Sequence, residues 1–321
     1  MADALFRAIA PTPFVTVQDA GRRGWRRFGL AGAGAMDKMS LVIANALVGN
    51  RPTEAVLEFA YAGGEWTVEA ASCRIAVAGG AFAVTVDGTP VPSLASTVLR
   101  RGQTLRIGGA TRRVWGYLAV AGGFDLPLAF GSRATHARTG IGGFEGRAIR
   151  AGDTLPLRGN EAPNEPERFL GDDPEEDGPC RVVPGPQDDY FDRESLSLLL
   201  SGAYQATWQQ DRMAYRLDGP RLTHVKGYNI ITDGIVPGCI QIPGTGQPIV
   251  LMRDAGTVGG YPKVATVVEA DLGRLAQTRP GGAVHFKAIS MMEARAVRQR
   301  FLARLQLIAE EVNSPLPRAA V

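Results

Sequence analysis

The chain has 321 residues, a formal net charge of +3 and a hydrophobic content of 45%. A chain of this length can bury a sizeable core and is long enough for two domains. Acidic and basic residues are spread along the sequence, which argues against a nucleic-acid groove with its clustered basic residues. The sequence shows neither a signal-peptide pattern at its start nor a run of about 18 apolar residues. We therefore expect a cytoplasmic protein that binds neither nucleic acid nor membrane.

Forty glycines and twenty-one prolines predict many tight turns between short strands, and hence a mainly β protein. The three cysteines are widely spaced and include no C-x-x-C pair, so a cysteine zinc site is not expected. We interpret them as reduced, buried thiols. The three histidines are far apart in sequence and no pattern groups them with carboxylates, so we predict no metal site.

Apolar runs separated by glycines predict a series of strands in the first half of the chain. Residues 74–91 read as a strand, a Gly-Gly break and a second strand that turns back at an Asp-Gly pair. Residues 36–50 form the clearest helix of this half. Asp37 can cap its start, and Gly49 suits its C-terminal end.

The middle of the chain has a distinct composition. Residues 159–180 are polar, acidic and rich in proline, and such a segment buries too little apolar surface to order itself. We interpret it as a linker between a first β-rich lobe, residues 1–158, and a second one, residues 181–321.

The second lobe is expected to contain short strands and two helices. Its first strand leads into a Pro-Gly-Pro turn and then a helix that begins near Asp188 or Asp189, because carboxylates favour a helix N-terminus. The chain closes with a long helix, which starts with a capping box formed by Ser290 and Glu293.

Several loops rich in glycine or proline carry arginine, glutamine and aspartate. Arginine forks bind carboxylate or phosphate with paired hydrogen bonds, glutamine fixes an amide, and glycine lets backbone N–H groups approach a ligand. Together the loops predict a binding site for a small anionic or amide substrate. The candidate catalytic residues are Asp211, Arg212, Tyr215 and Lys263. The candidate substrate-binding residues are Gln18, Asp19, Arg22, Gln187, Gln241, Gln247 and Tyr261.

Long motifs in both halves resemble the biotin-dependent carboxyltransferase family. They include GAMDKMSLVIANALVGN, YLAVAGGFDLPLAFGSRAT, QDRMAYRLDGP and GIVPGCIQIPGTGQPIVLM, and the resemblance covers about residues 12–290. The family includes allophanate hydrolase subunit 2, the Kip inhibitor antagonist and the C subunit of 5-oxoprolinase. The resemblance implies two β-barrel-type lobes of a cyclophilin-like fold, with a few helices, and a companion B subunit.

Among the activities of this family, the resemblance favours a subunit of an ATP-dependent 5-oxoprolinase, which opens 5-oxo-L-proline to L-glutamate. A homologue of the B subunit, and possibly the A subunit, would be its partners, and ATP would be consumed by the complex. No lysine stands in the Ala-Met-Lys-Met context of a biotinyl domain, so we expect no covalent biotin on this chain. Two alternatives stay open: a carboxyltransferase or allophanate hydrolase subunit in urea metabolism, and a regulatory protein that antagonises a kinase inhibitor.

Opening of a cyclic amide suggests roles for the candidate residues. Arg22, Arg212 and Lys263 would hold carboxylate or phosphoryl oxygens. Tyr215 and Tyr261 would line the pocket or transfer protons. The amide would be read by Gln187, Gln241 and Gln247.

Two of the loops share a Gln-Asp pair beside arginine. One pair is Gln18 and Asp19, and the other is Gln210 and Asp211. We interpret them as comparable turns of two related lobes, in which each aspartate orients a neighbouring arginine. No complete catalytic constellation is apparent, so the chain is expected to be inactive alone.

Overall fold

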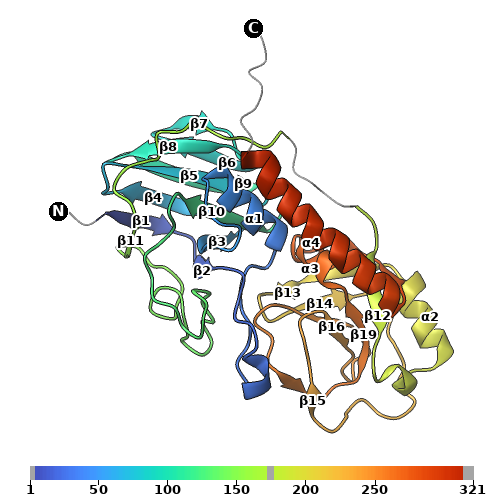
Figure 1. Ribbon diagram of the computed structural model, residues 1–321. Coiled ribbons are helices and arrows are strands. Elements are labelled where there is room, and N and C mark those ends of the chain that lie inside the picture. Colours follow the sequence, from blue (N-terminus) through green and yellow to red (C-terminus); the bar gives the residue numbers. More distant parts are fainter. Residues whose placement is uncertain (1–3, 172–176, 314–321) are drawn as a thin grey trace. The chain divides into compact units, whose positions relative to one another are not determined.

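The computed structural model describes residues 4–171 and 177–313, and its architecture is mainly β with four α-helices among these residues (Figure 1). The chain divides into two compact units. Unit 1 comprises Met1–Gly21, Asp37–Pro174 and Ala303–Val321, and unit 2 comprises Arg22–Met36 and Glu175–Leu302. Residues 172–176 of the predicted linker lie outside the described residues, and the three-part division expected from the sequence stays a prediction.

Unit 1 contains two antiparallel sheets. The first has the strand order β11-β1-β4-β9-β6-β7, with β1 (Leu5–Pro11), β4 (Gly64–Val68), β6 (Phe82–Val86), β7 (Thr89–Val91), β9 (Thr104–Ala110) and β11 (Thr154–Pro156). The second has the order β2-β3-β10-β5-β8, with β2 (Thr16–Gln18), β3 (Val56–Ala60), β5 (Ser72–Ala78), β8 (Ser96–Arg100) and β10 (Trp115–Val120).

The two sheets of unit 1 share one apolar core. Side chains alternate between buried and exposed along strands such as β6, which is the pattern of a sheet with one covered face. Phe59 from one sheet meets Phe82 from the other edge-on, with ring centroids 5.1 Å apart. The predicted turn between β6 and β7 is confirmed, because Asp87 and Gly88 have φ values of 48° and 79°, as a type I′ hairpin requires.

Helix α1 (Lys38–Leu47) packs on β5 and β10 of unit 1. It begins as predicted at Asp37, whose Oδ1 accepts hydrogen bonds from the backbone amides of Met39 and Ser40 at 3.0 and 3.4 Å. Just after the helix, Gly49 adopts a φ of 78°, the left-handed conformation that ends many helices.

The described residues 159–171 follow the surface of unit 1 through polar contacts. The buried side chain of Arg74 donates hydrogen bonds to the carbonyls of Pro163 and Pro166 at 3.1 and 2.6 Å. The backbone amide of Arg168 donates to Ser96 Oγ at 2.8 Å, and the Ser96 amide donates to the Arg168 carbonyl at 2.7 Å. A segment with little apolar surface is thus held in place by hydrogen bonds to buried groups.

Unit 2 is built on an eight-stranded sheet in the order β20-β13-β14-β17-β16-β19-β12-β21. The two edge strands, β20 and β21, are separated in the chain only by His285, whose carbonyl accepts a hydrogen bond from the Cys180 amide at 2.7 Å. This short connection brings both edges together, so the sheet is nearly a closed barrel. The strands are β12 (Cys180–Pro184), β13 (Tyr204–Gln210), β14 (Ala214–Asp218), β16 (Cys239–Gln241), β17 (Ile249–Leu251), β19 (Lys263–Val267), β20 (Ala283–Val284) and β21 (Phe286–Ala288).

A separate two-stranded sheet in unit 2 pairs β15 (Asp233–Gly234) with β18 (Val258–Gly259). The remaining elements of the unit are helical. They are the 3₁₀ turns η1 (Arg26–Phe28) and η2 (Asp188–Tyr190) and the helices α2 (Arg193–Ser201), α3 (Glu269–Ala276) and α4 (Met291–Asn313), the last of which ends within unit 1.

The helix predicted to start near Asp188 or Asp189 was placed too early. Only the 3₁₀ turn η2 forms there, because the next residue, Phe191, is buried in an extended conformation with φ −123° and ψ 145°. The α-helix starts after Asp192, whose Oδ1 accepts a hydrogen bond from the Ser195 amide at 2.7 Å.

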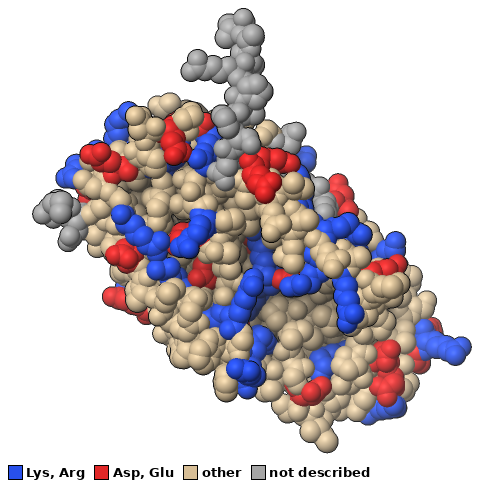
Figure 2. Space-filling model, viewed as in Figure 1, with Lys and Arg blue, Asp and Glu red and all other residues tan. Residues whose placement is uncertain are grey.

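The capping box predicted for the last helix is confirmed. The Ser290 amide donates to Glu293 Oε2 at 2.7 Å, and the Glu293 amide donates to Ser290 Oγ at 3.2 Å. None of the helices in the described part of the chain has the length and hydropathy that crossing a membrane requires. On the face shown in Figure 2, basic and acidic side chains are interspersed, consistent with the nearly balanced formal charge.

Candidate functional site

Four of the predicted residues lie together around Lys263 in unit 2. Lys263 is the first residue of β19 and pairs with Gln241, the last residue of β16. The Lys263 amide donates to Gln187 Oε1 at 3.2 Å, and Gln241 Nε2 donates to the Tyr261 carbonyl at 3.4 Å. We call Gln187, Gln241, Tyr261 and Lys263, together with Asp233, the Lys263 cluster.

Asp233 joins the cluster through an ion pair that the sequence did not reveal. The Nζ atom of Lys263, whose side chain is only 3% exposed, lies 2.7 Å from Oδ2 of Asp233, whose side chain is 54% exposed. The hydrogen bond from Lys263 holds the pKa of the Asp233 carboxyl below its usual range, and Gln187 contributes in the same direction. A buried cation therefore faces an ionised carboxylate at the surface.

Glycine at position 259 gives the Gln241 amide its space. A Cβ atom on Gly259 would lie 2.6 Å from Gln241 Nε2, which is too close for an ordinary contact. Gly259 pairs with Asp233 in the small β15–β18 sheet, so the same two-stranded sheet carries the carboxylate and leaves room for the amide. The arrangement brings an ammonium group, a carboxylate and two side-chain amides to one place, a set able to bind a ligand with carboxylate and amide groups.

Arg212 lies in the hairpin turn between β13 and β14 and binds an aspartate distant in sequence. Its Nε and Nη2 atoms donate to both oxygens of Asp254, at 2.9 and 2.7 Å, and Nη2 also donates to the Gly34 carbonyl at 2.9 Å. Asp211 instead accepts two backbone amides of the turn, at 2.7 and 3.0 Å. The expectation that Asp211 orients Arg212 is therefore wrong, because Asp211 is used to shape the turn.

Gln18 and Asp19 lie in unit 1 and organise a neighbouring loop. Gln18 is fully buried, and its Nε2 donates to the Thr135 carbonyl at 3.0 Å. Asp19 accepts hydrogen bonds from Ser132 Oγ and from the Arg133 amide, both at 2.6 Å. Both predicted substrate-binding side chains hold the loop after residue 131 in place.

The two Gln-Asp pairs are not comparable turns. Asp19 follows β2, which is an edge strand of a five-stranded sheet, whereas Asp211 lies in a hairpin between two neighbouring inner strands. The interpretation of these turns as an internal duplication is wrong, because a short sequence match does not fix topology.

Three other predicted residues make contacts with residues outside the Lys263 cluster. The side chain of Arg22 is buried, and its backbone amide donates to the Gly32 carbonyl at 2.7 Å. Tyr215 is fully buried, and its hydroxyl donates to the Ala276 carbonyl at 2.7 Å. Gln247 Nε2 donates to Asp218 Oδ1 at 2.6 Å.

The thiols are free and buried, as expected from the sequence. Burial raises the pKa of Cys73 to about 12 and that of Cys180 to about 11, so neither thiol is a ready nucleophile. Within residues 4–171 and 177–313, no group of three or more histidine, cysteine, aspartate or glutamate side chains is arranged to hold a metal ion.

Asp233 begins a glycine- and proline-rich loop whose Gln241 and Gln247 were predicted site residues, but the aspartate itself was not predicted. Asp233 lies thirty residues before its partner Lys263, a separation that no short motif records. The available signal was an Asp-Gly pair at the start of a glycine- and proline-rich loop, which is typical of a tight turn that exposes a carboxylate.

Curated proteins similar to this chain fall into two groups. The C subunit of 5-oxoprolinase from Escherichia coli (strain K12) is 37% identical over 301 residues, which cover 92% of this chain and 94% of that protein. The corresponding protein of Haemophilus influenzae is also 37% identical over 301 residues. Urea amidolyase of Saccharomyces cerevisiae is 29% identical over 90% of this chain but only 17% of its own length.

Two solved structures are also similar to this chain. A crystal structure of TTHA0988 matches with a TM-score of 0.80 and 35% identity, covering 89% of this chain and 56% of that one, so this chain spans little more than half of it. The K. lactis urea amidolyase matches with a TM-score of 0.87 and 26% identity over 98% of this chain and 20% of that one. The family model described as carboxyltransferase domain, subdomain A and B, matches residues 28–288. With that match and the homologous C subunits of 5-oxoprolinase, the chain belongs to the carboxyltransferase domain family, subdomains A and B.

Proposed function

We propose that this chain is the C subunit of an ATP-dependent 5-oxoprolinase that opens 5-oxo-L-proline to L-glutamate together with a B subunit. The support is the correspondence with the C subunit of the Escherichia coli enzyme over nearly the full length of both chains. An A subunit is a further partner, ATP is consumed by the complex, and the complex works in the cytoplasm. Each of the two lobes is expected to be a β-barrel of the cyclophilin-like type.

The observation that carries the proposal is the Lys263 cluster. 5-Oxoproline has one carboxylate and one ring amide, and the cluster offers a complementary group for each. Lys263 Nζ, now paired with Asp233 at 2.7 Å, would take the substrate carboxylate. The amides of Gln187 and Gln241 would pair with the ring amide.

The exposed position of Asp233 would allow the substrate carboxylate to replace it at Lys263. Its side chain is half exposed and sits on a two-residue strand, so water can solvate it when the substrate takes its place. Lys263 is buried and gains more from a replacement anion than from water. Tyr261, with its side chain partly exposed, would line the entrance.

The remaining predicted residues are not part of the Lys263 cluster. Arg212, bound to Asp254 and to the Gly34 carbonyl, would be a positioning residue for the loop that contains Gly34. The catalytic roles assigned from the sequence to Asp211 and Tyr215 stay predictions, as do the substrate contacts of Arg22 and Gln247.

A urea-linked carboxyltransferase is a second candidate because urea amidolyases are also relatives. Urea offers amide groups but no carboxylate, so it would leave the Lys263–Asp233 pair unused. The ion pair thus favours a carboxylate-bearing amide such as 5-oxoproline over urea.

The test is reconstitution with the companion subunits. The chain is purified alone and with homologues of the B and A subunits, and ATP-dependent loss of 5-oxoproline is measured for each mixture. We expect activity only in the mixture. Full activity from this chain by itself, or urea-dependent ATP hydrolysis without 5-oxoproline turnover, would contradict the proposal.

A pair of variants tests the site within the same complex. Lys263→Met removes the buried ammonium but keeps an unbranched apolar side chain, and we expect turnover to fall by roughly 10²–10³-fold, as for loss of one preorganised charged donor. Lys287→Met removes an exposed lysine of β21 in the same unit and should leave turnover within about twofold. Equal activity of both variants would exclude Lys263 from the substrate site while leaving the proposed place of the chain in the complex intact.

A further inference from the structure

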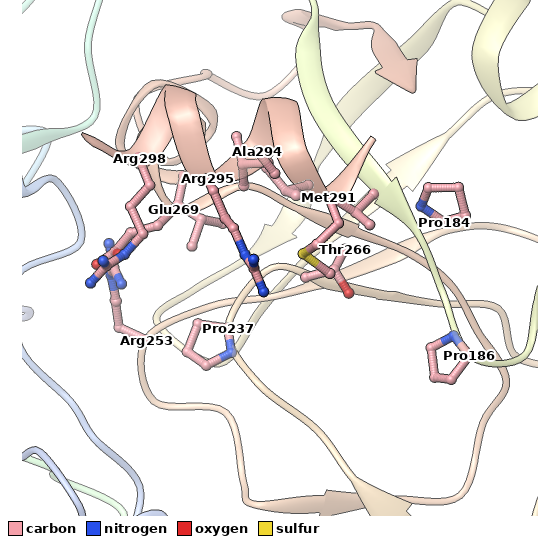
Figure 3. Close-up of a pocket in the computed structure, with 14 residues that line it drawn as sticks. Pro184, Pro186, Pro237, Arg253, Thr266, Glu269, Met291, Ala294, Arg295 and Arg298 are labelled. Atoms are coloured by element: carbon pink, nitrogen blue, oxygen red, sulfur yellow. The ribbon is translucent and has the colours of Figure 1, made fainter. Parts of the chain in front are cut away.

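Unit 2 has a pocket under the first turns of α4, and this pocket shares no residue with the Lys263 cluster (Figure 3). Its volume is about 570 Å³. Sites for small organic molecules measure roughly 300–1,000 Å³, so the pocket is large enough for a molecule with one or two rings. All of its lining residues belong to unit 2.

Part of the pocket wall is apolar and rigid. Pro184 and Pro186 line one end, Pro237 lies opposite α4, and Leu272 and Met291 add further apolar surface (Figure 3). Proline has a fixed φ and no backbone N–H group, so three of them form a stiff surface with few hydrogen-bond donors. Such a wall suits a flat apolar body better than a chain of polar groups.

The charged part of the pocket is strongly basic. Three arginines line it, Arg253, Arg295 and Arg298, against a single carboxylate, Glu269. Arg298 Nε donates to Glu269 Oε2 at 3.0 Å, so this carboxylate is already used by one arginine. The pocket therefore retains an excess of positive charge that an anionic ligand could neutralise.

Arg295 is the arginine best placed to meet that ligand. Its side chain extends from α4 across the pocket toward Pro237, while Arg253, Glu269 and Arg298 gather at one end (Figure 3). Among the described residues, Arg295 makes no ion pair. Its planar guanidinium can bind a carboxylate or phosphate with two hydrogen bonds and can stack on a ring.

We propose that this pocket binds a small organic anion, namely a flat ring system that carries one carboxylate or phosphate group. The ring lies against the proline wall, and the anionic group is held by Arg295 beside the other two arginines. An inorganic anion alone would leave most of the 570 Å³ unfilled, so the ring is part of the recognition. The site is independent of the 5-oxoproline function, because none of the Lys263 cluster lines it.

Binding of 8-anilinonaphthalene-1-sulfonate, a two-ring anion, to the full-length chain tests the proposal by fluorescence titration. We expect one saturable site. Arg295→Gln should weaken binding at least tenfold, through loss of a charge-assisted contact. Ala294→Trp, which fills the pocket without changing its charge, should abolish binding. Arg300→Gln is the matched control, because Arg300 is an exposed arginine of the same helix that does not line the pocket, and it should bind as the wild type does.

Displacement then identifies the anionic group. Adenosine 5′-monophosphate and 1-naphthoate compete with the dye in separate titrations, and displacement by one of them assigns a phosphate or a carboxylate. Dye binding that survives Ala294→Trp, with circular dichroism showing a folded chain, overturns the proposal. The proposal is also overturned if neither competitor displaces the dye at millimolar concentration. It is overturned as well if Ala294→Trp binds the dye normally and fails only to bind the B subunit.

Discussion

Replacement of Arg212 by alanine should cost folding stability, because its guanidinium connects two separate segments of unit 2. It donates two hydrogen bonds to Asp254, at 2.9 and 2.7 Å, and one to the Gly34 carbonyl at 2.9 Å. The side chains of Arg212 and Asp254 are only 13% and 11% exposed. Arg212→Ala would leave the Asp254 carboxylate in a mostly buried position without these two bonds.

The expected magnitude follows from that burial. An exposed ion pair contributes about 0–1 kcal/mol, whereas removing one partner of a buried pair costs about 3–5 kcal/mol. For a domain of roughly 150–250 residues, about 1 kcal/mol shifts the Tm by roughly 2–4 °C. Arg212→Ala should therefore lower the Tm of unit 2 by about 6–20 °C.

The assay is urea unfolding of wild type and variant, followed by circular dichroism, with thermal melts in parallel. The urea midpoint should fall while the slope of the unfolding free energy against urea stays the same. The double variant Arg212→Leu/Asp254→Leu should recover part of the loss, because it removes both buried charges. A stability loss below about 1 kcal/mol, together with lost 5-oxoproline turnover in the complex, would refute the structural reasoning and make Arg212 a substrate contact.

Three further predictions concern other parts of the molecule. Gly259→Ala should push the Gln241 amide aside and raise the KM for 5-oxoproline in the complex, since its Cβ would lie 2.6 Å from Gln241 Nε2; an unchanged KM would count against a substrate role for Gln241. Asp153 has a pKa lowered by its hydrogen bond from Arg147, so its contribution to stability is present above the unfolded pKa of about 3.9 and is lost as the pH falls through the lower folded value. Arg147→Gln should reduce the loss of unfolding free energy between about pH 5 and pH 2, measured by urea titration at each pH. An equal dependence of the unfolding free energy on pH in both proteins would contradict this prediction. The buried thiols of Cys73 and Cys180, with pKa values of about 12 and 11, should react with a disulfide reagent at neutral pH far more slowly in the native than in the urea-unfolded chain, and equal rates would contradict their burial.

Local features of the fold were predictable wherever a few neighbouring residues decide them. Asp37 and Gly49 fix the ends of α1, and Ser290 with Glu293 caps α4, because these contacts reach no more than four residues along the chain. The helix start at Asp192 was missed since it depends on burial of the preceding aromatic ring of Phe191, which no local pattern reveals.

The candidate site was only partly predictable, for a related reason. Gln187, Gln241, Tyr261 and Lys263 were singled out as polar residues in glycine- and proline-rich loops, and the fold brings them together. Residue type alone does not separate a side chain at a site from one that organises a loop. Gln18 was singled out by the same composition cues as Gln241, yet its Nε2 atom is used to hold the Thr135 carbonyl of a neighbouring loop.

Because residues 22–36 belong to unit 2, the two units cannot be separated by a single cut in the middle of the chain. This N-terminal stretch supplies Arg26, whose Nη2 donates to the carbonyls of Ile235 and Gly256 at 2.7 Å each, and Gly34, which accepts from Arg212. A coding sequence split near its midpoint would place these groups on a different polypeptide from the loops they hold. Neither half of such a split would therefore contain all the residues of unit 2.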